Sequence, residues 1–386
     1  MMRNWLPFLF VLLFCKSLTA QTVSIDKEKL LEYYQSQRYA EAAQYLQSIY
    51  PSDTQDIKAL GQMAYCNMMS GKLPDAEKNY LQINTLQPNS LPVLFSLTNI
   101  NTRRGNNAKA RSYLAQIISI DSTNFNAYKQ LAGLTDSSGL KLAYLKKANV
   151  LNATDADVAY DLATAYRNDK QYEPAYNVLK IAIAADTGNF ILQQTLLPMA
   201  NQLGKYKEVI AVGEKLLQND ADANVMKDVG KAYFFLKNYQ KCLSLYKVLE
   251  DAGTVNEAIV YYMTLSYREL KNYEMALVYA KKTIDEGIST NTTAYYGTLA
   301  GIYEEKKQFA NALTAYKRGL TFSSSNSIYY RMGLLYDLSL KQAKNALTYY
   351  NLYLKGKPDP EKDKEQIVYV KARIEALTNP KEAVTK

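Results

Sequence analysis

No histidine occurs in this sequence. Histidine is the most frequent general base at neutral pH and the most frequent ligand of transition metals in proteins. Its absence excludes catalytic triads built on an imidazole and metal sites that need one. We therefore expect no metal site and no cofactor, and we predict that the protein is not an enzyme. One enzymatic alternative remains, in which carboxylates such as Glu304 and Glu305 supply the chemistry.

Cysteine is scarce, and the common catalytic motifs are missing. The three cysteines are Cys15, Cys66 and Cys242, and none belongs to a C-x-x-C pair. The last two stand far apart in the sequence, so we expect two small core residues and no disulfide. No G-x-S-x-G, H-E-x-x-H or P-loop sequence is present.

Long runs of one charge are absent as well. The formal net charge is +9, and loss of Arg3 and Lys16 with an N-terminal leader would lower it to +7. The basic residues are scattered, with no run longer than a pair such as Arg103 and Arg104. This distribution favours a solvated mixed surface over a patch for nucleic acid or anionic lipid. We expect no nucleic-acid partner.

The one long apolar run lies at the N-terminus, which reads MMRNWLPFLFVLLFCKSLTAQ. Arg3 precedes the run and the small residue Ala20 follows it, which predicts a signal peptide over 1–20. The run is shorter than the roughly 20 residues of a spanning helix, so no transmembrane segment is expected in the mature chain. An uncleaved anchor and a lipoprotein modified at Cys15 remain as alternatives. The leader resembles those of exported proteins of Gram-negative bacteria, which implies a periplasmic or outer-membrane-associated location.

What the sequence does contain is a repeated segment. Its clearest copy is 156–189, ADVAYDLATAYRNDKQYEPAYNVLKIAIAADTGN. Apolar residues recur there at spacings of three and four, which is typical of amphipathic helices and excludes alternating strands. Leu162 and Tyr166 mark a first helix and Leu179 marks a second, so each copy is predicted to be two helices joined by a turn.

The pattern returns along nearly the whole chain. Small residues such as Ala163 and Ala312 recur where helix backbones would approach each other, and large residues recur between them. The fourth copy is shortened around 135–141. Pro198 in the sixth leaves two alternatives for 190–222, a kink or hinge that changes the curvature of the superhelix, and an irregularity that the helix tolerates. Ten copies are predicted, near 23–56, 57–90, 91–124, 125–155, 156–189, 190–222, 223–256, 257–290, 293–326 and 326–360. A capping helix and a tail are predicted over 361–386.

These units resemble the tetratricopeptide repeat family, whose 34-residue pattern runs W-x2-L-G-x2-Y, then A-x3-F, then P. The second copy matches with Leu60, Ala76, Tyr80 and Pro88. The resemblance implies an all-α, right-handed superhelical solenoid of about ten helix-turn-helix units over 21–360. Because so short a helix pair cannot bury its apolar face alone, the units must stack on their neighbours.

In this family, partners usually lie in a concave groove that the first helices of the repeats line. Cations, amides and aromatic rings there would suit an extended peptide, including one with acidic groups. The alternative is a solvated concave face without a single binding region. Carried over by register, the candidate groove residues are Phe95, Asn99, Arg103, Lys129, Tyr160, Arg167, Lys227, Lys231, Tyr261, Arg268 and Tyr330.

Together these features predict a non-enzymatic scaffold for protein–protein interaction in the bacterial periplasm or cell envelope. Its partner would be a protein or an extended peptide, and envelope association would run through that partner. The alternative is an envelope protein that binds a glycan or another cell-wall ligand, since the chain holds 34 tyrosines that could line a groove.

Overall fold

The structure, a computed structural model, describes residues 25–220, 222–285 and 291–379. These residues form twenty-one α-helices and one π-helical turn, and they contain no strand. The all-α prediction is confirmed. The predicted signal peptide, with Cys15, and the residues after 379 lie outside the described part of the chain.

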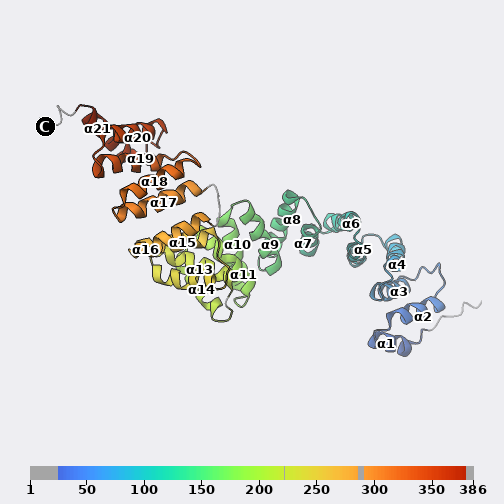
Figure 1. The fold of residues 1–386 in the computed structure, drawn as a ribbon. Coiled ribbons are helices and arrows are strands. Elements are labelled where there is room, and N and C mark those ends of the chain that lie inside the picture. The colour runs from blue at the N-terminus through green and yellow to red at the C-terminus, as the bar shows by residue number, and fades with distance from the viewer. Residues whose placement is uncertain (1–24, 221, 286–290, 380–386) are drawn as a thin grey trace, which may run out of the picture. The chain divides into compact units, whose positions relative to one another are not determined.

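The helices come in pairs that follow one another along the chain (Figure 1). The first helices of the pairs are α1 (Lys27–Gln35), α3 (Ile57–Met69), α5 (Leu91–Arg103), α7 (Phe125–Gly133), α9 (Ala156–Asn168), α11 (Phe190–Gln202), α13 (Ala223–Phe235), α15 (Glu257–Glu269), α17 (Thr292–Glu305) and α19 (Asn326–Leu334). The second helices are α2 (Tyr39–Ile49), α4 (Leu73–Leu86), α6 (Asn107–Ile120), α8 (Ser138–Leu151), α10 (Tyr172–Ala185), α12 (Tyr206–Leu217), α14 (Tyr239–Asp251), α16 (Tyr273–Asp285), α18 (Phe309–Leu320) and α20 (Ala343–Lys355). The π-helical turn η1 (Leu335–Ser339) follows α19, and α21 (Lys364–Thr378) follows the last pair.

The pairs begin and turn at recurring positions. Most first helices start after an Asp, Asn or Ser whose side chain accepts backbone N–H groups, as Asp56 accepts from Lys58 and Ala59. A residue in the left-handed region then directs the chain out of the first helix. The short α7 and its turn have no such residue, which fits the shortened fourth copy. The left-handed turn residues are Gln37, Gly71, Gly105, Lys170, Gly204, Lys237, Lys271, Lys307 and Lys341.

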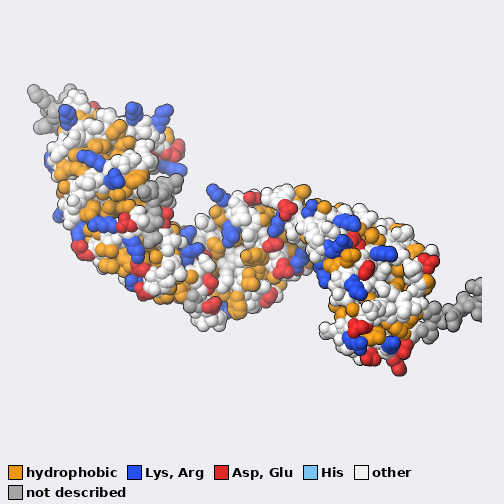
Figure 2. Space-filling model, turned by 45° about the vertical axis from the view of Figure 1, so that its right-hand side comes forward, with side chains coloured by type: hydrophobic (Ala, Val, Ile, Leu, Met, Phe, Trp, Pro, Cys, Tyr) orange, Lys and Arg blue, Asp and Glu red, His pale blue; other side chains and the backbone are white. Residues whose placement is uncertain are grey.

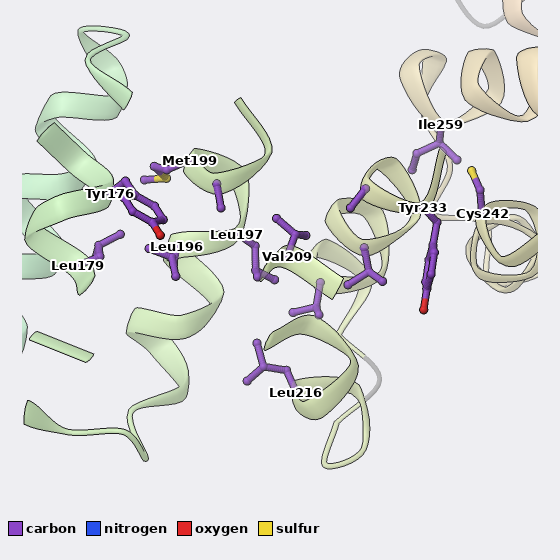
Figure 3. Packing of buried hydrophobic residues seen from close by; sticks show 14 of the residues in the cluster. Tyr176, Leu179, Leu196, Leu197, Met199, Val209, Leu216, Tyr233, Cys242 and Ile259 are labelled. Carbon is purple, nitrogen blue, oxygen red and sulfur yellow. The ribbon is translucent and has the colours of Figure 1, made fainter. Parts of the chain in front are cut away.

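The helices group into two compact units, Met1–Ala153 and Thr154–Lys386. In the first unit, one buried cluster contains Leu46 and Leu60 and another contains Leu94 and Leu114. In the second unit, most of the residues that helices α9 to α15 bury form one cluster together with Tyr279 of α16, and Figure 3 shows part of it. Helices α16 to α21 bury a further cluster around Tyr350. Each unit therefore has its own core, built where neighbouring helix pairs stack.

Glycine allows the closest approach between the helices of a pair. A Cβ built on Gly230 of α13 would lie 2.3 Å from the ring of Tyr246, which is fully buried on α14. In the last pair, a Cβ on Gly333 would lie 2.5 Å from the ring of Tyr350. In both pairs a tyrosine ring occupies the space that a side chain on the first helix would need.

Tyrosine hydroxyls also link neighbouring pairs through carboxylates. Tyr279 on α16 donates to Glu250 on α14 over 2.6 Å, and Lys282 donates to the same carboxylate over 2.5 Å. The Tyr176 hydroxyl on α10 donates to Glu208 on α12 over 2.6 Å in the same manner. These contacts give the abundant tyrosines a structural use, because the ring is buried while the hydroxyl stays hydrogen-bonded.

The Glu250 link makes stability depend on pH. Burial alone would raise the pKa of Glu250, but hydrogen bonds from Lys282, Tyr279 and Lys247 outweigh it and lower the pKa to about 2. A carboxyl with a lowered folded-state pKa stabilises the fold above its ordinary value of 4.5, and this contribution is lost as the pH falls towards about 2.

We therefore expect Glu250→Gln to be less stable than the wild type at neutral pH by on the order of 2 kcal/mol. In urea unfolding followed by circular dichroism, the two proteins should converge as the pH falls to about 2. A difference in free energy of unfolding that stays constant over this range would contradict the assigned link.

Cys66 and Cys242 are buried free thiols and belong to different units. Burial raises the pKa of Cys242 to about 11, although a hydrogen bond with Ser266 acts in the opposite direction. Both are core residues, as the sequence predicted. Within the described part of the chain, no helix combines the length and apolar character needed to cross a bilayer. Basic and acidic side chains are interspersed over the face shown in Figure 2.

Candidate functional site

The first helices α9, α11, α13 and α15 line a groove of about 610 Å³ in the second unit. Three predicted groove residues lie in it, namely Arg167 on α9 and Lys227 and Lys231 on α13. We call this surface the α9–α15 groove. Its other polar and aromatic lining includes Gln194, Thr195, Gln202, Asn224, Asn256, Tyr246 and Tyr262.

The cations of the groove form no close ion pair with described residues. None of Arg167, Lys227 and Lys231 forms an ion pair within the described residues, whereas many surface lysines elsewhere do. Of the two carboxylates in the lining, Asp222 is used as the cap of α13, where it accepts the N–H groups of Asn224 and Val225. Such a cap balances the positive end of the helix.

The second carboxylate, Asp228, lies at the back of the groove. Asn201 on α11 donates from Nδ2 to Asp228 Oδ1 over 3.0 Å and to the Asp228 carbonyl over 3.1 Å. Burial raises the pKa of Asp228, although Asn201 and the two lysines act to lower it. With three cations and two carboxylates in its lining, the groove keeps a net positive charge.

Pro198 lies inside α11, and it faces the groove together with Gln194. The structure keeps α11 as one helix across Pro198. Proline has no N–H, so the helical hydrogen bond to the Gln194 carbonyl is missing. The hinge predicted over 190–222 stays a prediction, and slower or equal hydrogen exchange there, compared with the flanking pairs, would count against it.

A second hollow, of about 300 Å³, lies between α15, α17 and α19. Two predicted residues, Tyr261 and Arg268, line it. Arg268 is engaged with Glu305, to which its Nε donates over 2.8 Å, and the Tyr261 hydroxyl lies 3.1 Å from Thr298 Oγ1. We call this surface the α15–α19 hollow.

The remaining predicted residues line neither of these two surfaces. Arg103 donates from Nη1 to the Met68 carbonyl over 3.2 Å, which holds it along the preceding pair. Tyr330 packs on the ring of Tyr353 with centroids 5.4 Å apart. The six residues are Phe95, Asn99, Arg103, Lys129, Tyr160 and Tyr330.

Sequence reasoning missed a second row of side chains on the same helices. The prediction included Lys227 and Tyr261, which share one register position, but not the residue that follows each of them. That following residue faces the two surfaces as well, since an α-helix presents adjacent positions along one broad stripe. Using both positions would have found this row, which consists of Thr195, Asp228, Tyr262, Thr298 and Arg331.

The carboxylates of the enzymatic alternative are engaged in contacts between helices. Glu304 accepts the hydroxyl of the buried Tyr316, and Glu305 is paired with Arg268. Among the residues that the structure describes, no three Asp, Glu or Cys side chains gather as a metal site would require.

Comparison with known proteins finds similarity among solved structures. No protein-family model and no curated protein matches the chain. A tetratricopeptide repeat protein from Parabacteroides merdae is 15% identical, with 64% of this chain and 98% of that one covered and a TM-score of 0.40. MamA is 19% identical, with 42% and 95% covered and a TM-score of 0.37. YrrB, described as a tetratricopeptide repeat protein with an unusual peptide-binding site, is 12% identical, with 43% and 87% covered and a TM-score of 0.36.

The fold follows from this chain's own repeats and not from these likenesses. Helix pairs recur along the described residues, with similar caps at most first helices and a left-handed residue at every turn except that after α7. Small residues on one helix face large residues on the other, as in the 34-residue pattern. The described residues form successive helix-turn-helix repeats of the kind that the 34-residue pattern predicts.

Proposed function

We propose that the protein is an interaction scaffold whose α9–α15 groove binds an extended, acidic segment of a partner protein. The observation that carries the proposal is the set of three cations, Arg167, Lys227 and Lys231, which line one groove without ion-pair partners among the described residues. Charged groups left unpaired in a concave surface favour a ligand of the opposite charge.

Polar side chains along the groove support an extended ligand. Gln194 and Thr195 of α11 present an amide and a hydroxyl to it. The amide side chains of Gln202, Asn224 and Asn256 offer further donors and acceptors along the same surface. A peptide would thus be held by its backbone and selected by its acidic side chains.

The proposal places this scaffold outside the cytoplasm, in the periplasm or at the envelope of a Gram-negative bacterium. The signal-peptide layout of residues 1–20 supports this location. Trp5 is the only tryptophan of the chain, so secreted protein cleaved after Ala20 should lack tryptophan fluorescence. Mature protein with that fluorescence would contradict cleavage at Ala20.

The groove can be tested with fluorescent peptides of equal length that differ only in the number of glutamates. We expect affinity, measured by fluorescence anisotropy, to rise with glutamate number and to fall with salt. The double variant Lys227→Ser/Lys231→Ser should bind the most acidic peptide about tenfold more weakly, because two charge pairs are lost.

A matched control is the variant Lys207→Ser/Lys215→Ser, which removes the same charge from exposed positions on α12. It should bind like the wild type. Equal losses in the two variants would mean that net charge alone attracts the peptide, and the groove assignment would be wrong. Preference for an uncharged glycan over every peptide would favour the alternative of a glycan-binding protein.

A further inference from the structure

The α15–α19 hollow contains two guanidinium groups that converge on a position without a side chain. Gly301 lies on α17, between Arg268 of α15 and Arg331 of α19. A Cβ built on Gly301 would lie 3.7 Å from Arg331 Nη2 and 4.0 Å from Arg268 Nη2. Both cations therefore flank one small space above the helix backbone.

The two cations differ in their partners. Arg268 donates from Nε and Nη2 to the same oxygen of Glu305, which leaves Nη1 without a described acceptor. Arg331 has no carboxylate within 4.0 Å among the described residues. The nearby Glu304 is engaged by the Tyr316 hydroxyl. The hollow thus holds the guanidinium of Arg331, which has no carboxylate partner, next to that of Arg268, whose Nη1 can still donate.

Hydroxyl donors complete the lining on the α19 side. Ser325 accepts the N–H of Ile328, so its own hydroxyl hydrogen is free to donate. Ser327 makes no hydrogen bond within the described residues and also lines the hollow. Donors therefore approach the space above Gly301 from α15 on one side and α19 on the other.

We propose that the α15–α19 hollow is a binding site for a phosphate group, held between Arg268 and Arg331 above Gly301. Arginine suits this ligand because its fixed fork of donors matches phosphate oxygens, and charge-assisted hydrogen bonds are the strong ones. Donors that arrive from opposite sides fit a tetrahedral group better than a planar carboxylate, which presents two oxygens in one plane. The site is separate from the α9–α15 groove and does not depend on it.

The phosphate can come from inorganic phosphate or from a phosphomonoester on a partner, and calorimetry separates these sources. The probes are inorganic phosphate, phenyl phosphate and acetate. Saturable binding of both phosphate probes is expected, and tighter binding of phenyl phosphate would identify a phosphomonoester as the source. Acetate binding as tight as phosphate, or no binding of either phosphate probe at millimolar concentration, would overturn the proposal.

The decisive variant is Gly301→Ala, because it places a methyl group in the space above residue 301 where the phosphate is proposed to bind. The protein itself tolerates that methyl group at ordinary contact distances, so the fold should be kept. Phosphate binding should weaken at least about tenfold in Gly301→Ala and in Arg331→Gln. The matched control is Gly61→Ala on α3, where a Cβ would meet nothing within 4 Å.

Unchanged melting temperatures of Gly301→Ala and Gly61→Ala would show that neither substitution disturbs folding. Wild-type phosphate affinity in both Gly301→Ala and Arg331→Gln would overturn the site. The Lys227→Ser/Lys231→Ser variant should keep full phosphate affinity, so failure of the peptide-binding proposal and failure of this one give different results.

Discussion

Gly230→Ala should destabilise the second unit by about 2 to 3 kcal/mol, although it adds only one methyl group. The new Cβ would lie 2.3 Å from Cε1 of Tyr246 and 2.8 Å from its Cζ. The ring cannot move cheaply, because it is fully buried and its hydroxyl donates to the Lys227 carbonyl over 3.0 Å. Close-packed interiors transmit such strain instead of absorbing it. A lower midpoint in urea unfolding measures the effect.

Two companion variants make this result specific. Gly61→Ala, where a Cβ meets nothing within 4 Å, should be neutral or stabilising, because alanine favours a helix over glycine. Gly230→Ala/Tyr246→Leu should recover part of the loss, since the repeat at 156–189 carries Ala163 and Leu179 at the equivalent positions. If Gly230→Ala alone were as stable as the wild type, α13 and α14 would not approach each other as closely as described.

The helix pairs could be predicted from the sequence because the same steric requirement recurs many times. A single small residue says little, but Ala163, Gly230 and Gly333 fall in one register, each opposite a large residue on the second helix. The all-α fold and the order of the helix pairs follow from this repetition. The shortened fourth pair could be predicted for the same reason, because a missing stretch interrupts the regular spacing of the repeats in the sequence.

Other features depend on details that the pattern does not carry. Lysine occupies the left-handed turn position in five of the pairs, as at Lys170 and Lys341, where glycine would have been expected. The sequence pattern also does not predict which charged side chains form ion pairs with each other. Arg268 was predicted to face a ligand, and it does line the hollow. However, one edge of its guanidinium is already hydrogen-bonded to Glu305 from the next pair. Contacts between pairs depend on helix placement, which spacing within one pair does not determine.

The two proposed sites use the same row of first helices in different ways. In the α9–α15 groove, lysines and amides spread along several helices, which suits an extended chain. In the α15–α19 hollow, Gly297 and Gly301 remove side chains from α17 and leave a confined space beside Arg331. One repeat architecture can thus present a long binding surface and a small pocket, because each pair sets its own lining while sharing the core positions.

Arg373→Met should cost about 3 kcal/mol, because it leaves a buried carboxylate without its cation. Asp337 in η1 is 4% exposed and accepts Arg373 Nε over 2.8 Å and Nη2 over 2.9 Å. The guanidinium holds the pKa of Asp337 below its ordinary value, against burial, which acts to raise it. Without Arg373, the Tyr350 hydroxyl is the one described donor that remains hydrogen-bonded to this carboxylate. The pair also joins α21 to the last repeat, so its loss should expose the end of the stack.

Hydrogen exchange distinguishes loss of this cap from a general loss of stability. In Arg373→Met, exchange should accelerate in α19, α20 and α21 first, because each repeat depends mainly on its neighbours. Lys371→Met, which removes a charge from an exposed position of the same helix, should change neither exchange nor the urea midpoint. Adding Asp337→Asn to Arg373→Met should restore part of the stability, since the uncompensated charge is then gone. If hydrogen exchange accelerated uniformly along the second unit, α21 would not act as a local cap. If the double variant were no more stable than Arg373→Met, the buried charge of Asp337 would not be the cause of the lost stability.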